Sequence, residues 1–542
     1  MSVESKYYRH TPTVNLDRKW PSSSLNAAPE WCSVDLRDGN QALPVPMNQS
    51  SKTEYFQMLC RLGFEQVEVG FPSASDIEYE FVRGLVVNGL IPDNVVPQVL
   101  TPCRHALIKR TIESLAGMSK AIVHLYCSTS PTQRKIVFGM SKDEVKRTIL
   151  MSVNDVVEMC GSSDCEISLE FSPEHFNQTE LEYSLEICEA VAELWLPRRY
   201  GRLILNLPAT VECCSPNQFA DQVEWMHEHL SCRNEVALSV HTHNDRGCAV
   251  AATELALLAG ADRVEGTLFG NGERTGNADL ITLAGNLLSQ GINPHIELGN
   301  IPELRENYQK LTGMAVGERS PYVGELVFTA FSGTHQDAIS KGIKESRKGD
   351  KWDVPYLLVD PADFGRAYEP VVRINSQSGK GGLDFVLRAE YGIAMPKAML
   401  DHFLDKVKKL SADIGEIAPE KMFNLFYEQY CDNQSVLRLS PAYGYIEITD
   451  TDAIAETKII INTLERSIEM ICMEIFQALE LNLEVSFCES QSENEIKHAV
   501  YAEVVNKQTS QKAYGACITG GFSVAKLMAL VNAVNNLISP PD

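Results

Sequence analysis

The chain has 542 residues, of which 44% are hydrophobic and 22% charged, and its 48 Lys and Arg against 72 Asp and Glu give a formal net charge of -24. This composition is typical of globular proteins that fold in water. Because a single hydrophobic core stops growing at roughly 250–300 residues, we expect two or three domains. The acid excess, with no Lys/Arg block among aromatic residues, argues against nucleic acid as a partner.

The sequence also argues against a membrane partner. No segment reaches the roughly 18 apolar residues of a transmembrane helix, and residues 1–20 lack the apolar stretch of a signal peptide. We therefore expect a cytoplasmic protein. The 15 cysteines are scattered, so we interpret them mainly as reduced packing residues.

Short β-branched runs alternate with amphipathic helical segments between residues 30 and 275. The runs are WCSVDLRD, EQVEVGF, VVPQVLT, KAIVHLYCS, CEISLEFSPE, RLILNLPAT, EVALSVHTH and DRVEGTLFG. Eight strand and helix units in about 250 residues are typical of a (β/α)8 barrel. A doubly wound open sheet is the alternative, but no G-x-G-x-x-G sequence follows the first run.

Alternation along the predicted strands separates an apolar face from a polar one. In EVALSVHTH, His241 and His243 share a face with Ser239, and in CEISLEFSPE, Glu170 and Glu174 share a face that also holds Glu166, Ser168 and Ser172. We expect the polar faces to point into the barrel. Their polar residues gather at the C-terminal strand ends, where the active sites of such barrels lie.

The pattern changes after residue 295. Residues 300–430 show mainly helical periodicity, with glycine-rich turns in SGTHQDAISKG and NSQSGKGG. From residue 435, four alternating runs (VLRLS, YIEIT, LEVSF and AVYAEVV) and two helical stretches near residues 463–480 and 523–538 predict an α+β module of about 100 residues. We therefore predict an N-terminal extension (1–29), a (β/α)8 barrel (30–295), a helical region (296–434) and a C-terminal α+β domain (435–542).

The sequence His241-Thr242-His243 predicts a metal site. On a strand, residues i and i+2 point the same way, so both imidazoles can bind one divalent ion. Two histidines held only by hydrogen bonds are the alternative. Asp38, at the end of WCSVDLRD, would complete a site of two histidines and one carboxylate that leaves positions open for substrate.

GNGERTGN, at residues 270–277, follows the last run. Its glycines allow the backbone to approach a ligand closely, and Glu273, Arg274 and Asn277 add polar groups. A loop that merely turns the chain is the alternative. Asp245 and Arg246 are expected to cap the helix that follows HTHND.

Eight motifs together resemble the 2-isopropylmalate synthase family, within the DRE-TIM metallolyase, HMG-CoA lyase-like superfamily. They are DLRDGNQAL, EVGFPSAS, LEFSPE, NLPATVE, HTHND, GNGERTGN, SGTHQDAISKG and NSQSGKGG. The resemblance runs from about residue 15 to 430. It implies a TIM barrel followed by helical subdomains and a regulatory-type α+β domain. It also implies an acyltransferase that condenses acetyl-CoA with 2-oxoisovalerate in leucine biosynthesis.

The resemblance assigns roles to individual residues. Asp38, His241 and His243 would bind the metal, with Asn277 close by, and Arg37 would lie beside the oxo-acid oxygen. The oxo-acid pocket would consist of Leu100, His124, Tyr126, Ser172, Asn206, Pro208 and Thr210. Glu174, His335 and Tyr356 would act in acetyl-CoA activation and product formation. Either His335 or Glu174 could be the base that deprotonates the acetyl group.

The family also implies cofactors and a partner subunit. The expected metal is Zn²⁺, Mn²⁺ or Mg²⁺, and a monovalent cation such as K⁺ stays open. The region after the barrel can reach the active site of the other subunit, which implies a homodimer.

Three other readings stay open. One is a related synthase for another 2-oxo acid, of the citramalate, ethylmalate, homocitrate or benzylmalate type. A second is a retro-aldol lyase on the same barrel. A third, a non-catalytic relative, is disfavoured by the complete set of Asp38, His241, His243, Arg37 and Glu174.

The last hundred residues depart from the family. Its C-terminal domain binds leucine beside a glycine-rich turn, but the corresponding stretch here, residues 461–477, contains no glycine. We therefore predict weakened or absent leucine feedback. The alternative is that ITGGF, at residues 518–522, supplies the site.

Overall fold

The computed structural model describes residues 17–540 except for residues 162, 331, 347–350, 369–378, 416, 441–443, 450–457, 464–465, 492–497 and 520–521. The chain divides into two compact units. One comprises Met1–Val327 with Val359–Ala367, and the other Phe328–Leu358 with Tyr368–Asp542. The domain boundaries expected at residues 29, 295 and 434 stay predictions.

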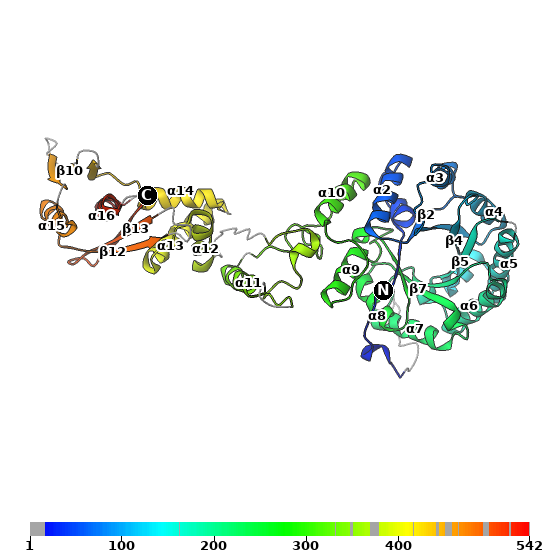
Figure 1. Cartoon of the computed structure of the whole chain (residues 1–542). Helices are drawn as coiled ribbons and strands as arrows, with labels where there is room; N and C mark the ends of the chain where they lie inside the picture. The colour runs from blue at the N-terminus through cyan, green and yellow to red at the C-terminus, as the bar shows by residue number, and fades with distance from the viewer. Residues whose placement is uncertain are drawn as a thin grey trace. The chain divides into compact units, whose positions relative to one another are not determined.

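The first unit contains a closed barrel of eight parallel strands that pair in chain order, as predicted (Figure 1). The strands are β1 (Glu30–Ser33), β2 (Gln66–Gly70), β3 (Val96–Pro102), β4 (Lys120–Ser128), β5 (Glu166–Glu174), β6 (Leu203–Ala209), β7 (Val236–Thr242) and β8 (Arg263–Gly266). β1 pairs with β8 and closes the barrel.

Helices surround these strands. They are α2 (Gln49–Leu62), α3 (Asp76–Val87), α4 (His105–Ser114), α5 (Lys142–Cys160), α6 (Leu181–Trp195), α7 (Pro216–His229), α8 (Ala249–Leu258), α9 (Leu280–Ser289) and α10 (Ile301–Thr312). Local sequence sets several of their ends. α5 begins at a capping box of Ser141 and Glu144, and α2 ends at Gly63, whose φ of 100° suits glycine.

The first β-branched run differs from the prediction. Its strand ends at Ser33, and the π-helical turn η2 (Asp35–Gly39) follows. Both carboxylate oxygens of Asp35 accept from the backbone N–H of Leu268, and one also accepts from Tyr55 at 2.8 Å. These bonds hold the turn against the barrel, so Asp38 lies on a turn rather than on a strand.

The second unit holds the later helices and two antiparallel sheets. Its helices are α11 (Gly333–Ser346), α12 (Lys380–Tyr391), α13 (Lys397–Ile414), α14 (Pro419–Tyr430), α15 (Ile468–Ala478) and α16 (Phe522–Ile538). One sheet has the order β11-β10-β9, from Lys458–Asn462, Tyr445–Thr449 and Leu437–Ser440, and the other has the order β12-β13-β14, from Leu483–Gln491, His498–Asn506 and Lys512–Thr519. The predicted C-terminal α+β class is therefore confirmed.

Two of these strands were not predicted, β11 and β14. KIIIN in β11 has three consecutive isoleucines between Lys458 and Asn462, so it shows no alternation, and KAYGACIT in β14 is rich in small residues. Gly515 in β14 is needed for packing, because a Cβ there would lie 2.3 Å from the carbonyl oxygen of Ala529 in α16.

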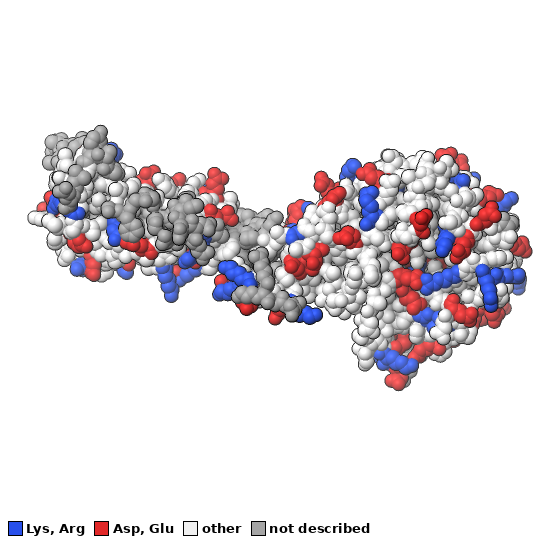
Figure 2. All heavy atoms as spheres, in the orientation of Figure 1, with Lys and Arg blue, Asp and Glu red and all other residues white. Residues whose placement is uncertain are grey.

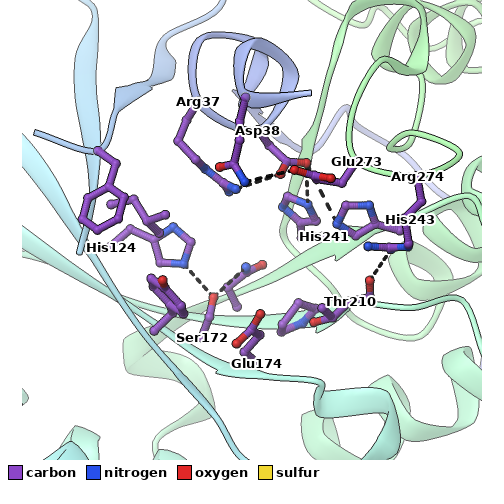
Figure 3. A pocket seen from close by; sticks show the side chains of 16 residues that line it. Arg37, Asp38, His124, Ser172, Glu174, Thr210, His241, His243, Glu273 and Arg274 are labelled. Carbon is purple, nitrogen blue, oxygen red and sulfur yellow. Dashed lines mark hydrogen bonds and ion pairs between the residues drawn. The ribbon is translucent and has the colours of Figure 1, made fainter. Parts of the chain in front are cut away.

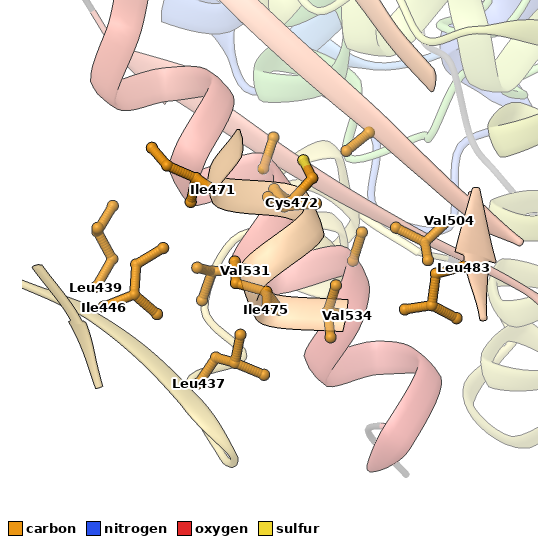
Figure 4. Packing of buried hydrophobic residues seen from close by; sticks show 14 of the residues in the cluster. Leu437, Leu439, Ile446, Ile471, Cys472, Ile475, Leu483, Val504, Val531 and Val534 are labelled. Carbon is orange, nitrogen blue, oxygen red and sulfur yellow. The ribbon is translucent and has the colours of Figure 1, made fainter. Parts of the chain in front are cut away.

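An apolar core joins α15, α16 and the two sheets. Figure 4 shows Ile471 and Ile475 of α15 close to Val531 and Val534 of α16, with Leu437 of β9 beside them. All five are almost fully buried. This burial accounts for the apolar residues at helical spacing in α15 and α16.

Charged side chains of both signs are mixed on the surface of the barrel. In Figure 2 carboxylate and cationic side chains are spread together over the drawn face of the barrel. Within the described ranges, none of the helices has the length and apolar character that crossing a membrane requires. Residues 375–378 of NSQSGKGG, residues 464–465 and residues 520–521 of ITGGF lie outside the described ranges.

Candidate active site

A cavity of about 350 Å³ lies at the C-terminal ends of the barrel strands. All the residues assigned from the family resemblance line it except Asn277, His335 and Tyr356. Four further residues line it: Gln41, Phe71, Glu273 and Arg274. Gln41 and Phe71 belong to the motifs DLRDGNQAL and EVGFPSAS, which was the available signal for them.

One carboxylate and two imidazoles converge at one side of this cavity. Oδ2 of Asp38 lies 3.9 Å from Nε2 of His241 and 4.0 Å from Nε2 of His243. All three side chains are buried, and Figure 3 shows Asp38 above the paired histidine rings. Their donor atoms are close enough together to hold one metal ion.

Asn277 shows that this cluster fits a cation. Its Nδ2 donates to Oδ2 of Asp38 at 2.6 Å and to the carbonyl of Asn271 at 3.0 Å, which orients the amide. Its Oδ1 therefore faces Nε2 of His241 at 3.0 Å. Acceptor atoms thus converge from Asp38, Asn277 and the histidines, and a positive ion is the group that satisfies such a set.

The protonation states also suit metal ligands. Burial and the neighbouring His241 lower the pKa of His243 to about 4, so its ring is neutral at pH 7. Burial would raise the pKa of Asp38, but Arg37 and the two histidines outweigh it and lower this pKa. Neutral imidazole and ionised carboxylate are the forms that coordinate metals.

Arg37 brings a fixed positive charge to the same space. Its Nη1 lies 2.9 Å from Oδ1 of Asp38 and its Nε donates to Oε2 of Glu68. Burial opposes the charged guanidinium, but these two carboxylates raise the pKa of Arg37 overall. The guanidinium of Arg37 is therefore a fixed positive charge that lines the cavity, and its bonds to Asp38 and Glu68 set its orientation.

His124 lies on the opposite side of the cavity. Its Nδ1 is 2.7 Å from Oε1 of Glu68, and its Nε2 is 2.7 Å from Oγ of Ser172. Nδ2 of Asn206 also donates to that hydroxyl, at 2.9 Å. Burial would lower the pKa of His124, but Glu170 and Glu68 raise it to about 9, so the ring is cationic at pH 7.

The glycine-rich loop after β8 closes one edge of the cavity. Arg274 donates to Oδ1 of Asp245 and to the carbonyl of Thr210, both at 2.6 Å. A Cβ at Gly276 would lie 1.9 Å from the carbonyl oxygen of Gly270, so only glycine fits this turn.

The expectation that Asp245 and Arg246 cap α8 is wrong. Asp245 pairs with Arg274 instead, and Oδ1 of Asn244 accepts from the N–H of Ala249 at the start of α8. Glu212 accepts from the N–H groups of Arg246 and Cys248. The carboxylate of Asp245 thereby anchors the glycine-rich loop.

Glu174 and the two residues beyond the barrel complete the assigned set. Glu174 lines the cavity and accepts a hydrogen bond from Ser128. His335 and Tyr356 belong to the second unit, where their rings stack with centroids 3.9 Å apart. Tyr356 is 64% exposed. The roles assigned to all three stay predictions.

Known protein families match the barrel and the region that follows it. The family model described as HMGL-like matches residues 28–307, and the model described as "Alpha-isopropylmalate synthase, post-catalytic domain-like" matches residues 325–388. A 2-isopropylmalate synthase of Clostridium acetobutylicum is 45% identical over 98% of this chain and 99% of its own length. One from Pseudomonas fluorescens is 50% identical over 79% of this chain and 77% of its own length.

Proposed function

Because the chain belongs to the 2-isopropylmalate synthase family, we propose that it condenses acetyl-CoA and water with 2-oxoisovalerate. The products are 2-isopropylmalate and CoA, and the reaction commits carbon to leucine biosynthesis. The observation that carries the proposal is the cavity in which Asp38, His241 and His243 face Arg37 and the polar ends of β4, β5 and β6.

Asp38, His241, His243 and Asn277 would hold a divalent ion, Zn²⁺, Mn²⁺ or Mg²⁺. When bound, the ion supplies Lewis-acid polarisation of the substrate C2 carbonyl. Arg37, fixed by Asp38 and Glu68, offers its guanidinium to the same oxygen. Negative charge develops on that oxygen when the new C–C bond forms, and a preoriented cation stabilises it.

The opposite wall suits a small 2-oxo acid. Cationic His124, with Ser172 and Asn206, favours the substrate carboxylate. Leu100 and Pro208 give apolar surface for the isopropyl group. Because one methylene in such a pocket is worth about 1–3 kcal/mol, 2-oxobutyrate should react more slowly than 2-oxoisovalerate rather than not at all.

The acetyl methyl group must lose a proton before it attacks C2. Glu174 and His335 are the candidate bases. Glu174 lies in the cavity, whereas His335 belongs to the second unit. Water then cleaves the thioester, CoA leaves as the thiol, and loss of this bond drives the reaction forward. We infer that His335 and Tyr356 act across a homodimer.

A panel of 2-oxo acids assayed for CoA release tests the proposal. Thiol release from acetyl-CoA should have its highest kcat/KM with 2-oxoisovalerate, and mass spectrometry should find 2-isopropylmalate. A higher kcat/KM for pyruvate, 2-oxobutyrate or a longer oxo acid would contradict the substrate. Cleavage of a hydroxyacyl-CoA without thiol release would instead identify a lyase.

A further inference from the structure

We propose that Glu265 is a positioning residue that fixes the ring and tautomer of His241 for metal binding. Glu265 lies on β8 and is fully buried. Glu265 is not among the residues that line the cavity, and no sequence motif assigns it a role. The inference rests on the proposed metal centre, but it concerns a residue that would not touch the ion or the substrate.

The contact between the two side chains is direct. Nδ1 of His241 lies 2.9 Å from Oε2 of Glu265. The other ring nitrogen, Nε2, faces Asp38 and Asn277. A donor bond at Nδ1 leaves the lone pair of Nε2 directed at the position where the acceptor atoms converge.

Neighbouring donors show that Nδ1 of His241 is the donor in this contact. Oε1 of Glu265 accepts from Nε2 of Gln98 at 2.8 Å and from Nη1 of Arg263 at 3.1 Å. Its Oε2 accepts from Nδ2 of Asn206 at 3.3 Å. Both oxygens thus act as acceptors of N–H groups, so His241 must supply the proton between Nδ1 and Oε2.

The same donors hold the carboxylate in place. Arg263 is fully buried, and its Nη2 donates to Oε1 of Gln98 at 2.7 Å while its Nη1 donates to Ser239 at 2.8 Å. Gln98 is therefore fixed, and so is the oxygen of Glu265 to which it donates. A ring held by such a support cannot rotate without breaking several buried bonds.

The donor atoms of His124, Glu170 and Glu265 also lie close enough together for an ion. Nη1 of Arg263, however, lies 3.1 Å from both Oε2 of Glu170 and Oε1 of Glu265. The guanidinium thus supplies the positive charge among these carboxylates. Glu265 therefore acts toward the ion only through His241.

Glu265→Gln tests the inference without substrates. Mn²⁺ is titrated into metal-free protein, and the free ion is measured by electron paramagnetic resonance. Because loss of such a supporting bond typically weakens metal affinity by about 10–100-fold, we expect the Kd for Mn²⁺ to rise by that factor. Far-UV circular dichroism and the thermal midpoint show that the variant is folded.

Glu170→Gln is the matched control. Glu170 is equally buried and also contacts Arg263. Its carboxylate contacts Arg263 and also His124, so the substitution removes a buried charge beside Arg263 while the bond between Glu265 and His241 stays in place. We expect Mn²⁺ binding within about twofold of the unsubstituted chain, whereas His241→Ala should lose most of it.

A folded Glu265→Gln variant with unchanged Mn²⁺ affinity would overturn the inference, as would an equal loss in Glu170→Gln. If Glu265→Gln does not fold, Glu265→Asp keeps the charge beside Arg263 and withdraws the carboxylate from His241 by about 1.5 Å. Wild-type affinity in that variant would also refute it. Because no substrate is present, failure of the oxo-acid panel leaves this result interpretable.

Discussion

The buried charge on His124 should make barrel stability depend on pH. Its ring contacts Glu68 and Glu170, which raise its pKa to about 9 against the opposition of burial, whereas the ordinary value is 6.5. Below about pH 6.5 the ring is protonated in the folded and unfolded states, and the contribution is complete. As pH rises through 9 the folded state also loses the proton, and the contribution disappears.

The size of this contribution follows from the pKa difference. Each pKa unit corresponds to about 1.36 kcal/mol, so a shift from 6.5 to about 9 is worth about 3 kcal/mol, to order of magnitude. Urea unfolding of the wild type and His124→Gln at pH 6 and pH 9.5 measures it. The two chains should differ by about 3 kcal/mol more at pH 6 than at pH 9.5.

Tryptophan fluorescence is a suitable signal, because all the tryptophans except Trp352 lie in the unit that contains the barrel. His105→Gln is the control, since His105 lies on the barrel surface with its side chain 66% exposed. It should leave the pH dependence as in the wild type. A stability difference between wild type and His124→Gln that is constant from pH 6 to pH 9.5 would refute the reasoning.

Three further predictions concern the ion, the dimer and regulation. Asp38→Ala should abolish CoA release and weaken metal binding while the circular dichroism spectrum stays native; full activity would contradict the assigned site. Asp38→Ala and His335→Ala should each be inactive alone but regain activity when co-expressed, if each site uses both subunits; no recovery would contradict the shared site. Leucine should inhibit initial rates weakly or not at all, and strong micromolar inhibition lost on deleting residues 435–542 would contradict this.

The leucine prediction has a structural basis at the start of α15. Oγ of Ser467 accepts from the N–H of Met470, so the helix caps its own first turn. A glycine-rich turn would instead leave such N–H groups available to a small ligand. The observation supports weak feedback, which stays a prediction until leucine is titrated.

Alternation along the strands was the most informative feature of the sequence. It predicted that His241 and His243 point to the same side, and that Ser172 and Glu174 share the inner face of β5. All four line the cavity, although β7 ends at Thr242 and His243 follows it. The strand ends near Asp38 were harder to predict. A π-helical turn has no periodic signature in the sequence. The turn is held by hydrogen bonds that Asp35 accepts from Tyr55 and Leu268, and both donors are distant from it in sequence.

The alternation of polar and apolar residues also does not show how deep in the barrel an inward-facing side chain lies. Glu265 and Glu68 sit on inner faces, yet whether such a carboxylate reaches the cavity or lies beneath it depends on the stagger of neighbouring strands. His241 on β7 pairs with Glu265 on β8, and Leu100 on β3 with His124 on β4. These registers, which the sequence does not show, decide which polar residues line the cavity and which support it.

Below the cavity, Glu68, Glu170, Glu265 and Arg263 form a buried polar layer, here called the floor. Its presence is better explained by the orientation it gives to the site residues than by a gain in the stability of the fold. Buried ion pairs often contribute less to stability than apolar residues of the same size would, yet Glu68, Glu170, Glu265 and Arg263 are all fully buried here. Each of the three carboxylates contacts a residue that lines the cavity: Glu68 contacts Arg37 and His124, Glu170 contacts His124, and Glu265 contacts His241. The floor therefore sets the direction of every cationic or metal-binding group it touches, which an apolar core could not do.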